Sequence, residues 1–382
     1  MPKHFRTIDT ARKTLGAIEN SAIDELLAGR IGRREFLRHG SVLGLSLPFL
    51  GGIASAVGLG VPQARAEGKP GGTVRAGVAV PGGAIDPVTF YDSGSYQLAF
   101  QTSEFLCVTQ PDLTLKPVLA ESWSPNADGS VWTFKLRKGV KFHNGEDFKA
   151  DDVVATFDRL ADPNGPSNAL SVFKGLLSKG STRKVDDHTV EFHLDAPNGS
   201  FPYSVSIDNY NAVILPASYK GDYEKTFEGT GPFRLESYTP KVGANFVRNP
   251  DYWGEKALPD RLEFKFYADV QPRILALQAG EVDVLDAIPL DVSQVVLGNP
   301  DITVLRVAST AHRQLHMRCD MAPFTDKRVR QALALCIDRS QLVDVSVAAW
   351  RPPAMTARSL PPSRSPTSRC RSAPRTSPRP SS

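Results

Sequence analysis

The segment Trp132-Thr133-Phe134-Lys135-Leu136 alternates strictly between apolar and polar side chains. A period of two predicts a β-strand with one face in a core and the other face in water. Asn126-Ala127-Asp128-Gly129, just before it, contains the residue types of a hairpin turn. A helix is predicted further on, because Asp151-Asp152 can cap its start. The apolar residues of that helix share one face: Val153, Val154, Phe157 and Leu160.

Similar patterns continue on both sides of this segment. Strands are predicted at 71–80, 262–267 and 282–285, and a second hairpin at 185–194. Helices are predicted at Tyr96–Val108, from Pro272 to Gly280, and after Asp326 as a cap. Strands alternate with helices and hairpins, so the predicted fold class is α/β (mixed α+β) with mixed sheets.

Aromatic residues and glycines in these elements have predicted structural roles. The period-two spacing of the aromatics predicts a sheet core rather than ligand contact, for Trp123, Trp132, Phe134 and Phe142. Four glycines lie where the chain is predicted to turn, and a positive φ would require glycine there: Gly139, Gly145, Gly229 and Gly231.

Length and composition exclude several protein classes. The 382 residues leave room for two domains of roughly 100–200 residues each. An apolar content of 41% with 23% charged residues excludes collagen-like, fully disordered and polytopic membrane chains. The net charge of +4 is unevenly spread, because residues 67–350 carry 29 basic and 36 acidic residues. The basic character lies in the two ends, so nucleic acid is not an expected partner.

Residues 1–66 are predicted to be a twin-arginine signal peptide. Gly32-Arg33-Arg34-Glu35-Phe36-Leu37-Arg38 resembles the motif whose arginine pair the export machinery reads. An uncharged stretch from Gly40 to Val61 follows, and then Ala64-Arg65-Ala66, a small-residue cleavage pattern. We expect cleavage near Ala66 and a mature protein in the periplasm. A retained membrane anchor is the alternative, since the stretch is long enough to span a bilayer.

The cysteines are not expected to form disulfides. Cys107, Cys319 and Cys336 are isolated from one another and are predicted to pack as apolar residues.

The C-terminal segment has a biased composition. In residues 351–382, 23 of the 32 residues are Arg, Pro or Ser, which predicts a disordered tail. The tail is either a natural basic segment that attracts anionic partners or the product of a reading-frame shift.

Catalytic motifs are absent from the sequence. It contains no Walker loop, no G-x-G-x-x-G and no G-x-S-x-G. Ser171-Val172-Phe173-Lys174 fits S-x-x-K, but its partner motifs are missing. His312 and His316 would share one face of a strand, yet no third metal ligand has fitting spacing. We therefore expect that the protein is not an enzyme and that it has no cofactor and no metal site.

Several blocks of the chain occur together in one order. They are Leu115–Trp123, Trp132–His143 with Gly145 and Ala150–Val153, Gly229–Phe233, Arg248–Trp253, Leu277–Asp283 and Pro323–Leu333. Together they resemble family 5 of the bacterial extracellular solute-binding proteins, the peptide- and nickel-binding components of ABC importers. The resemblance covers roughly residues 70 to 344.

The resemblance implies a periplasmic binding protein type II-like fold of two lobes that close on a ligand. On this reading residues 67–310 form lobe one, residues 311–350 the hinge and the start of lobe two, and residues 351–382 the tail. Most of lobe two is missing on this reading, and the chain is expected to be truncated or frameshifted after about residue 344. A chain of this kind is expected to bind solute more weakly than its relatives.

The resemblance also implies a function. The chain would be a monomer that captures peptides or related small solutes for an inner-membrane ABC permease. The loop after Asp86-Pro87 approaches the ligand in the family, which makes four residues candidate ligand contacts: Tyr91, Asp92, Ser93 and Tyr96. Two alternatives are a periplasmic hydrolase or metalloenzyme, and an interaction protein with a basic anion-binding tail.

Overall fold

The structure, a computed structural model, describes residue 12 and residues 15–45, 50, 53, 68–288, 296, 299–305, 315–339 and 341–342. The chain divides into two compact units. The first unit comprises Met1–Ile288 with Thr303–Arg313, and the second comprises Pro289–Ile302 with Gln314–Ser382. Within the described ranges, the structure has no helix with the length and apolarity that a membrane span requires.

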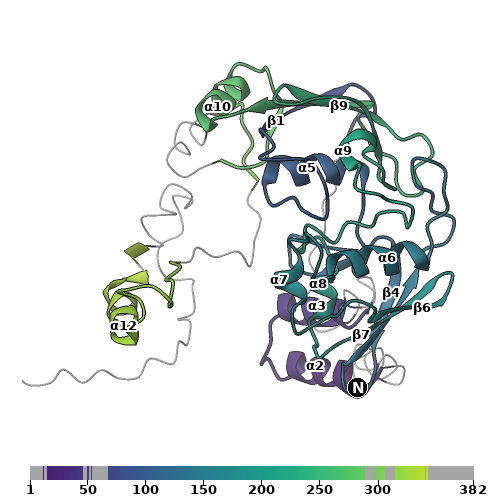
Figure 1. The fold of residues 1–382 in the computed structure, drawn as a ribbon, viewed down its shortest axis with the longest axis vertical. Helices are drawn as coiled ribbons and strands as arrows, with labels where there is room; N and C mark the ends of the chain where they lie inside the picture. Colours follow the sequence, from purple (N-terminus) through teal and green to yellow (C-terminus); the bar gives the residue numbers. More distant parts are fainter. Residues whose placement is uncertain are drawn as a thin grey trace, which may run out of the picture. The chain divides into compact units, whose positions relative to one another are not determined.

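A five-stranded sheet joins distant parts of the first unit (Figure 1). Its strands, in spatial order, are β11 (Val284–Leu285), β1 (Thr73–Ala79), β10 (Arg261–Tyr267), β9 (Gly243–Arg248) and β8 (Phe233–Thr239). The central strand β1 pairs in parallel with both β10 and β11, whereas β8, β9 and β10 pair antiparallel. The predicted strands 71–80 and 262–267 are confirmed, and 282–285 is confirmed over its last two residues.

A four-stranded antiparallel sheet contains the segment that first indicated strands. Its order is β4 (Ala120–Pro125), β5 (Val131–Leu136), β7 (Thr189–His193) and β6 (Thr182–Asp186). The predicted turn between β4 and β5 is confirmed, with Asn126 N donating to Val131 O at 2.8 Å and Gly129 at a φ of 74°. A two-stranded sheet is formed by β2 (Cys107–Thr109) and β3 (Leu115–Pro117).

Helix α6 (Ala150–Leu160) packs on β6 and β7. The predicted cap Asp151-Asp152 is confirmed for Asp152, whose carboxylate accepts a hydrogen bond from Lys149 N at 2.7 Å. Asp151 instead pairs with Lys184, and the helix begins at Ala150, before both aspartates. Among the described residues 68–288, the further helices are α5 (Ser93–Thr102), α7 (Leu170–Phe173), α8 (Phe201–Ser204), α9 (Tyr223–Thr226) and α10 (Val270–Gln278). Helix α10 begins two residues before the predicted start at Pro272, after Asp269 as its N-cap.

The helix predicted at Tyr96–Val108 is wrong at both ends. Helix α5 already begins at Ser93, because the Asp92 side chain accepts a hydrogen bond from Ser95 N. It ends at Thr102, and Cys107–Thr109 forms β2 instead. The Thr102 carbonyl accepts from Gly231 N at 2.8 Å, a partner more than a hundred residues away. Tertiary pairing therefore decides where the helix ends.

Aromatic side chains form much of the core of the first unit. Phe192 lies 5.3 Å from Phe134, 5.0 Å from Phe157 and 5.0 Å from Phe201, measured between ring centroids. The predicted core aromatics are confirmed as buried: Trp123, Trp132, Phe134 and Phe142.

Two of the four predicted positive-φ glycines are confirmed. Gly139 and Gly145 have φ values of 73° and 92°. The prediction is wrong for Gly229 and Gly231, which do not have a positive φ. A Cβ on Gly229 would lie 2.1 Å from Thr102 O, and one on Gly231 would lie 2.6 Å from Thr102 C. These two positions require glycine because two backbones approach each other closely.

The N-terminal segment forms two helices in the uncleaved chain, α2 (Ala17–Leu27) and α3 (Arg33–Val42). They share a small core of their own, which contains Ile23, Leu26, Phe36, Leu37, Leu50 and Ile53. Ala66 lies outside the described residues, so the predicted cleavage there and the predicted boundaries 67–310, 311–350 and 351–382 stay predictions.

The second unit contains α12 (Lys327–Cys336). The predicted cap is confirmed, because Asp326 accepts a hydrogen bond from Arg328 N at 2.8 Å. Cys107 is buried as predicted, but Cys319 and Cys336 are exposed, so the prediction that these two pack in a core is wrong. Helix α12 has no buried residue in this unit, which leaves Cys336 without surroundings to pack against. His312 and the tail 351–382 lie outside the described residues.

Candidate ligand-binding site

The carboxyl ends of three parallel strands meet at one edge of the five-stranded sheet. Ala79 at the end of β1 is in register with Tyr267 at the end of β10. On the other side of β1, Leu285 pairs with Gly77, and Asp286 follows directly. Open α/β sheets usually bind their ligands beyond such carboxyl ends. This edge is therefore the candidate site.

The first turn of α5 lies against the end of β1. A Cβ on Gly94 would be 2.4 Å from Ala79 O and 2.9 Å from Pro81 N. Glycine is needed here because any side chain would push the helix off the strand. The loop after Asp86-Pro87 and the start of α5 are held at the sheet edge by this contact.

The Asp92 side chain stabilises the start of α5. One carboxylate oxygen accepts from Ser95 N at 3.0 Å, and the other accepts from Ser95 Oγ at 2.7 Å. Both oxygens are thus directed toward the first turn of α5, whose start they stabilise. A direct contact of Asp92 with a ligand stays a prediction.

Tyr96 lies in a row of aromatic rings that we name the aromatic row: Phe100, Tyr96, Tyr210 and Phe90. Its ring is stacked at 5.4 Å on Phe100 and at 5.4 Å on Tyr210, and Phe90 meets it edge-on at 6.4 Å. Partial burial, and to a smaller extent the charge of Asp286, raises the pKa of Tyr96. The hydroxyl therefore remains protonated and can donate a hydrogen bond.

Asp286 connects three elements at the same edge. Its carboxylate accepts from Arg273 Nη1 of α10 and from Gln97 Nε2 of α5, each at 2.8 Å. The Arg273 side chain is only 9% exposed, so this ion pair is shielded from water. It joins α10, α5 and the end of β11, and it places a carboxylate and a carboxamide next to the turn that carries Tyr96.

The four predicted site residues occupy the loop end and the first turn of α5. Tyr91 is 66% exposed, which makes it the most accessible of them. Ser93 and Tyr96 are half-buried. Sequence reasoning missed Gln97, Tyr210 and Asp286. Asp286 could have been found, since it directly follows a predicted strand, but no local pattern marks Tyr210.

These groups are suited to binding a polar solute. Polar solutes can form hydrogen bonds with tyrosine hydroxyls, a carboxamide and a carboxylate. The apolar parts of such a solute can pack on aromatic rings. In the described part of the chain, no group of three or more His, Cys, Asp or Glu residues is placed to hold a metal ion. Ser171 donates to the Asn168 carbonyl, so its hydroxyl is paired with the backbone and not with Lys174.

Comparison with known proteins agrees with this architecture. The family model described as bacterial extracellular solute-binding proteins, family 5 (middle part) matches residues 114–368. The match extends beyond Asp344, where the sequence-based resemblance ends, and into the predicted tail.

Individual relatives support the same assignment. The chain is 34% identical over 258 residues to di/tripeptide-binding protein 2 of Pseudomonas aeruginosa, covering 61% of this chain and 48% of that protein. It is 31% identical over 275 residues to the glutathione-binding protein GsiB of Shigella boydii, covering 71% and 53%. The crystal structure of a Pseudoalteromonas dipeptide-binding protein with Met-Leu matches with a TM-score of 0.58 at 25% identity, covering 72% and 58%. The chain thus spans about half the length of the curated relatives it matches.

Proposed function

Because the chain belongs to family 5 of the bacterial extracellular solute-binding proteins, we propose that it binds peptides or related small solutes in the periplasm for an inner-membrane ABC permease. Proteins of this family are transport binding proteins, and the mixed α/β fold is that of type II periplasmic binding proteins. The observation within the structure that carries the proposal is the aromatic row beside Asp286, at the carboxyl edge of β1, β10 and β11.

Each group at this edge has a defined part in the proposal. The hydroxyl of Tyr96 contacts the solute, with Tyr210 and Phe100 stacked on its ring and holding it in place. Tyr91, which is exposed, adds a second hydroxyl from the loop. Asp92 and Ser93 support this turn, and Ser93 offers one further hydroxyl donor. No cofactor is part of the proposal.

Export is the second part of the proposal. Residues 1–66 direct the chain through the twin-arginine machinery and are removed near Ala66, and the mature chain acts as a monomer. The support is the ordered series of arginine pair, uncharged stretch and small-residue site in the sequence. Replacing Arg33 and Arg34 with lysine is expected to leave uncleaved protein in the cytoplasm. Unchanged periplasmic accumulation would contradict the export route.

A binding titration of the full chain tests the solute part. Isothermal calorimetry and equilibrium dialysis would use defined dipeptide and tripeptide pools and glutathione, because relatives are named for these ligands. Tyr96→Ala removes the central ring of the aromatic row and is expected to weaken binding about tenfold, the equivalent of about 1.4 kcal/mol. Val242→Ala is the control, since Val242 is 67% exposed in the turn between β8 and β9.

The outcomes separate the possible readings. Saturable binding that weakens in Tyr96→Ala and not in Val242→Ala supports the proposal. Absence of saturable binding for every probe up to millimolar concentrations contradicts it, and equal binding by the two variants moves the site elsewhere. The expectation that this chain binds weakly stays a prediction, and a micromolar or tighter dissociation constant would overturn that expectation alone.

A further inference from the structure

Helix α3, which begins with the arginine pair, is packed against α2. Phe36 and Leu37 are 1% and 5% exposed and share a small core with Ile23 and Leu26 of α2. Both apolar residues lie between Arg34 and Arg38, inside the stretch that resembles the export motif. A receptor that reads this stretch must therefore first remove them from that core.

The C-terminal end of α3 is attached to the folded domain. Leu115 N donates to Ser41 Oγ at 2.8 Å, and Trp123 Nε1 donates to Val42 O at 2.8 Å. The guanidinium of Arg38 lies 5.6 Å from the centre of the Tyr203 ring. These contacts differ in chemistry and come from three separate parts of the domain, so they define one position of the helix and not a general apolar contact.

Gly44 provides an independent sign that this position is specific. It has a φ of 83°, and a Cβ there would lie 1.9 Å from Trp123 O. Gly29 also has a positive φ, of 66°, but nothing lies within 4 Å of its Cβ position. The backbone of Gly44 therefore packs closely against β4, whereas the positive φ of Gly29 is needed only for the local turn.

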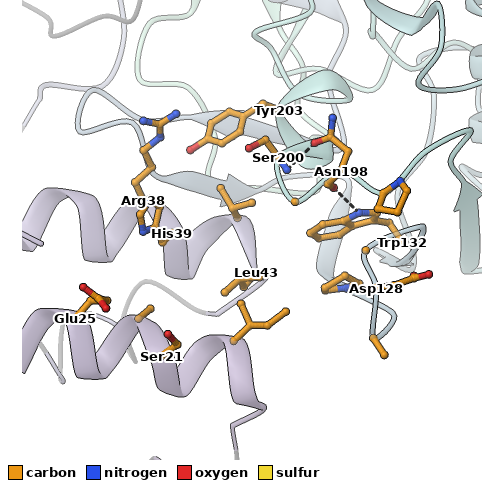
Figure 2. A pocket seen from close by; sticks show the side chains of 18 of the residues that line it. Ser21, Glu25, Arg38, His39, Leu43, Asp128, Trp132, Asn198, Ser200 and Tyr203 are labelled. Carbon is orange, nitrogen blue, oxygen red and sulfur yellow. Dashed lines mark hydrogen bonds between the residues drawn. The ribbon is translucent and has the colours of Figure 1, made fainter. Parts of the chain in front are cut away.

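The seam between the helices and the domain is not continuous. A cavity of about 740 Å³ lies here, lined among others by Arg38, Leu43, Tyr203 and Trp132. Figure 2 shows Arg38 next to Tyr203, with Leu43 on the helix side and Trp132 on the domain side. Ile18 and Val42 also line this cavity. The attachment therefore depends on the contacts at Ser41–Gly44, and single hydrogen bonds of about 1 kcal/mol each keep such an attachment reversible.

We propose that packing on α2, with α3 attached to the folded domain, shields Phe36 and Leu37 of the twin-arginine motif in the uncleaved chain, so that release of α3 makes the motif readable. The docking surface is formed by Leu115, Trp123 and Tyr203, and its occupant is the segment 38–44 of the same chain. This inference rests on the proposed twin-arginine export. Packing and receptor binding compete for Phe36 and Leu37, so any change that weakens the packing should increase the fraction of readable chain.

A matched pair of substitutions on α2 tests the shield from that side. Ile23 is fully buried against Phe36 and Leu37, whereas Leu27 on the same helix is 41% exposed and does not line the cavity. Full-length chain is purified uncleaved from cells that lack the translocase, and trypsin cleavage within residues 33–38 is followed over time. Ile23→Asp is expected to speed this cleavage at least tenfold, because a buried carboxylate opens the core. Leu27→Asp should stay within about twofold.

A second matched pair tests the attachment to the domain. Gly44→Ala and Gly29→Ala place the same methyl group at two positive-φ positions, but only the first meets Trp123 O. Gly44→Ala is expected to speed the same trypsin cleavage and to raise the initial rate of export in a pulse-chase experiment at least twofold. Gly29→Ala is expected to change neither rate by that factor. Unchanged urea unfolding of the domain, followed by tryptophan emission, confirms that the domain remains folded.

The results distinguish failure of this inference from failure of the export proposal. Faster cleavage and faster export in both Ile23→Asp and Gly44→Ala support the shield. If the chain with lysine at 33 and 34 is blocked while these variants are exported no faster than their controls, the shield is wrong and the export route stands. If the lysine chain is exported at the unaltered rate, the export route is wrong and the shield falls with it.

Discussion

The carboxylate of Glu104 accepts a hydrogen bond from Trp253 Nε1 at 2.8 Å, although 149 positions separate the two residues. The same carboxylate accepts from Tyr252 Oη at 2.6 Å and from Thr230 Oγ1 at 2.9 Å. Glu104 is 7% exposed, and this burial raises its pKa. Helix α5 carries the candidate site. The segment that follows α5 is thereby joined to the turn that follows β9.

We expect Glu104→Ala to lower the free energy of unfolding by about 3 kcal/mol, because three donors lose their common acceptor. Glu104→Gln keeps the shape and one acceptor oxygen, so about 1 kcal/mol is expected. Urea unfolding followed by tryptophan emission measures both. The full loss in Glu104→Ala with no loss in Glu104→Gln would show that side-chain volume, and not hydrogen bonding, accounts for the effect.

A pH dependence is expected from His143. Burial lowers its pKa to about 4, and its Nε2 lies 3.0 Å from Gly231 O. The unfolded chain binds a proton at an ordinary pKa of about 6.5, so stability present above that pH is lost as the pH falls toward 4. The unaltered chain should lose up to about 3 kcal/mol more than His143→Asn between pH 7 and pH 4. Parallel stability curves for the two chains would contradict this assignment.

Gly231→Ala is expected to destabilise the first unit by about 1–3 kcal/mol, since its Cβ would lie 2.6 Å from the Thr102 backbone. Gly199→Ala is the matched control, because nothing lies within 4 Å of its Cβ position. Thermal unfolding of the two variants checks the difference. The assignment of Gly231 to close backbone approach fails if both variants unfold at the same temperature.

The ion pair at the candidate site should be worth more than an exposed one. Asp286→Ala leaves Arg273, whose side chain is 9% exposed, without its acidic partner, and a loss of about 2–4 kcal/mol is expected. Asp320→Ala breaks the pair with Arg318, in which the Arg318 and Asp320 side chains are 71% and 64% exposed, and should cause no measurable loss. Chemical denaturation compares them. A small loss in Asp286→Ala would mean that water already screens the pair.

Local patterns predicted much of the secondary structure correctly. The turn at Asn126–Gly129, the Asp152 cap of α6 and the Asp326 cap of α12 were all predicted and are confirmed. Each depends on hydrogen bonds between residues only a few positions apart. Such interactions are already present in a short stretch of chain, which is why residue type and spacing are sufficient to predict them.

The errors of prediction fall where distant segments meet. The end of α5 at Thr102 and the need for glycine at Gly231 are two sides of one contact between segments far apart in the sequence. Tyr210 joins Tyr96 in the same way, and Asp286 joins Arg273 and Gln97 only after the sheet has formed. Alternation and capping residues carry no information about these partners.

The amino-acid sequence by itself therefore determined the class of elements, the aromatic core and the blocks by which the family was recognised. Only the tertiary structure decided which residues stand beside Tyr96 and that α3 is seated on Trp123. The physical reason is that strand alternation and helix caps are encoded within a few neighbouring residues. A site at the carboxyl edge of parallel strands exists only when β1, β10 and β11, from both ends of the domain, are brought into register.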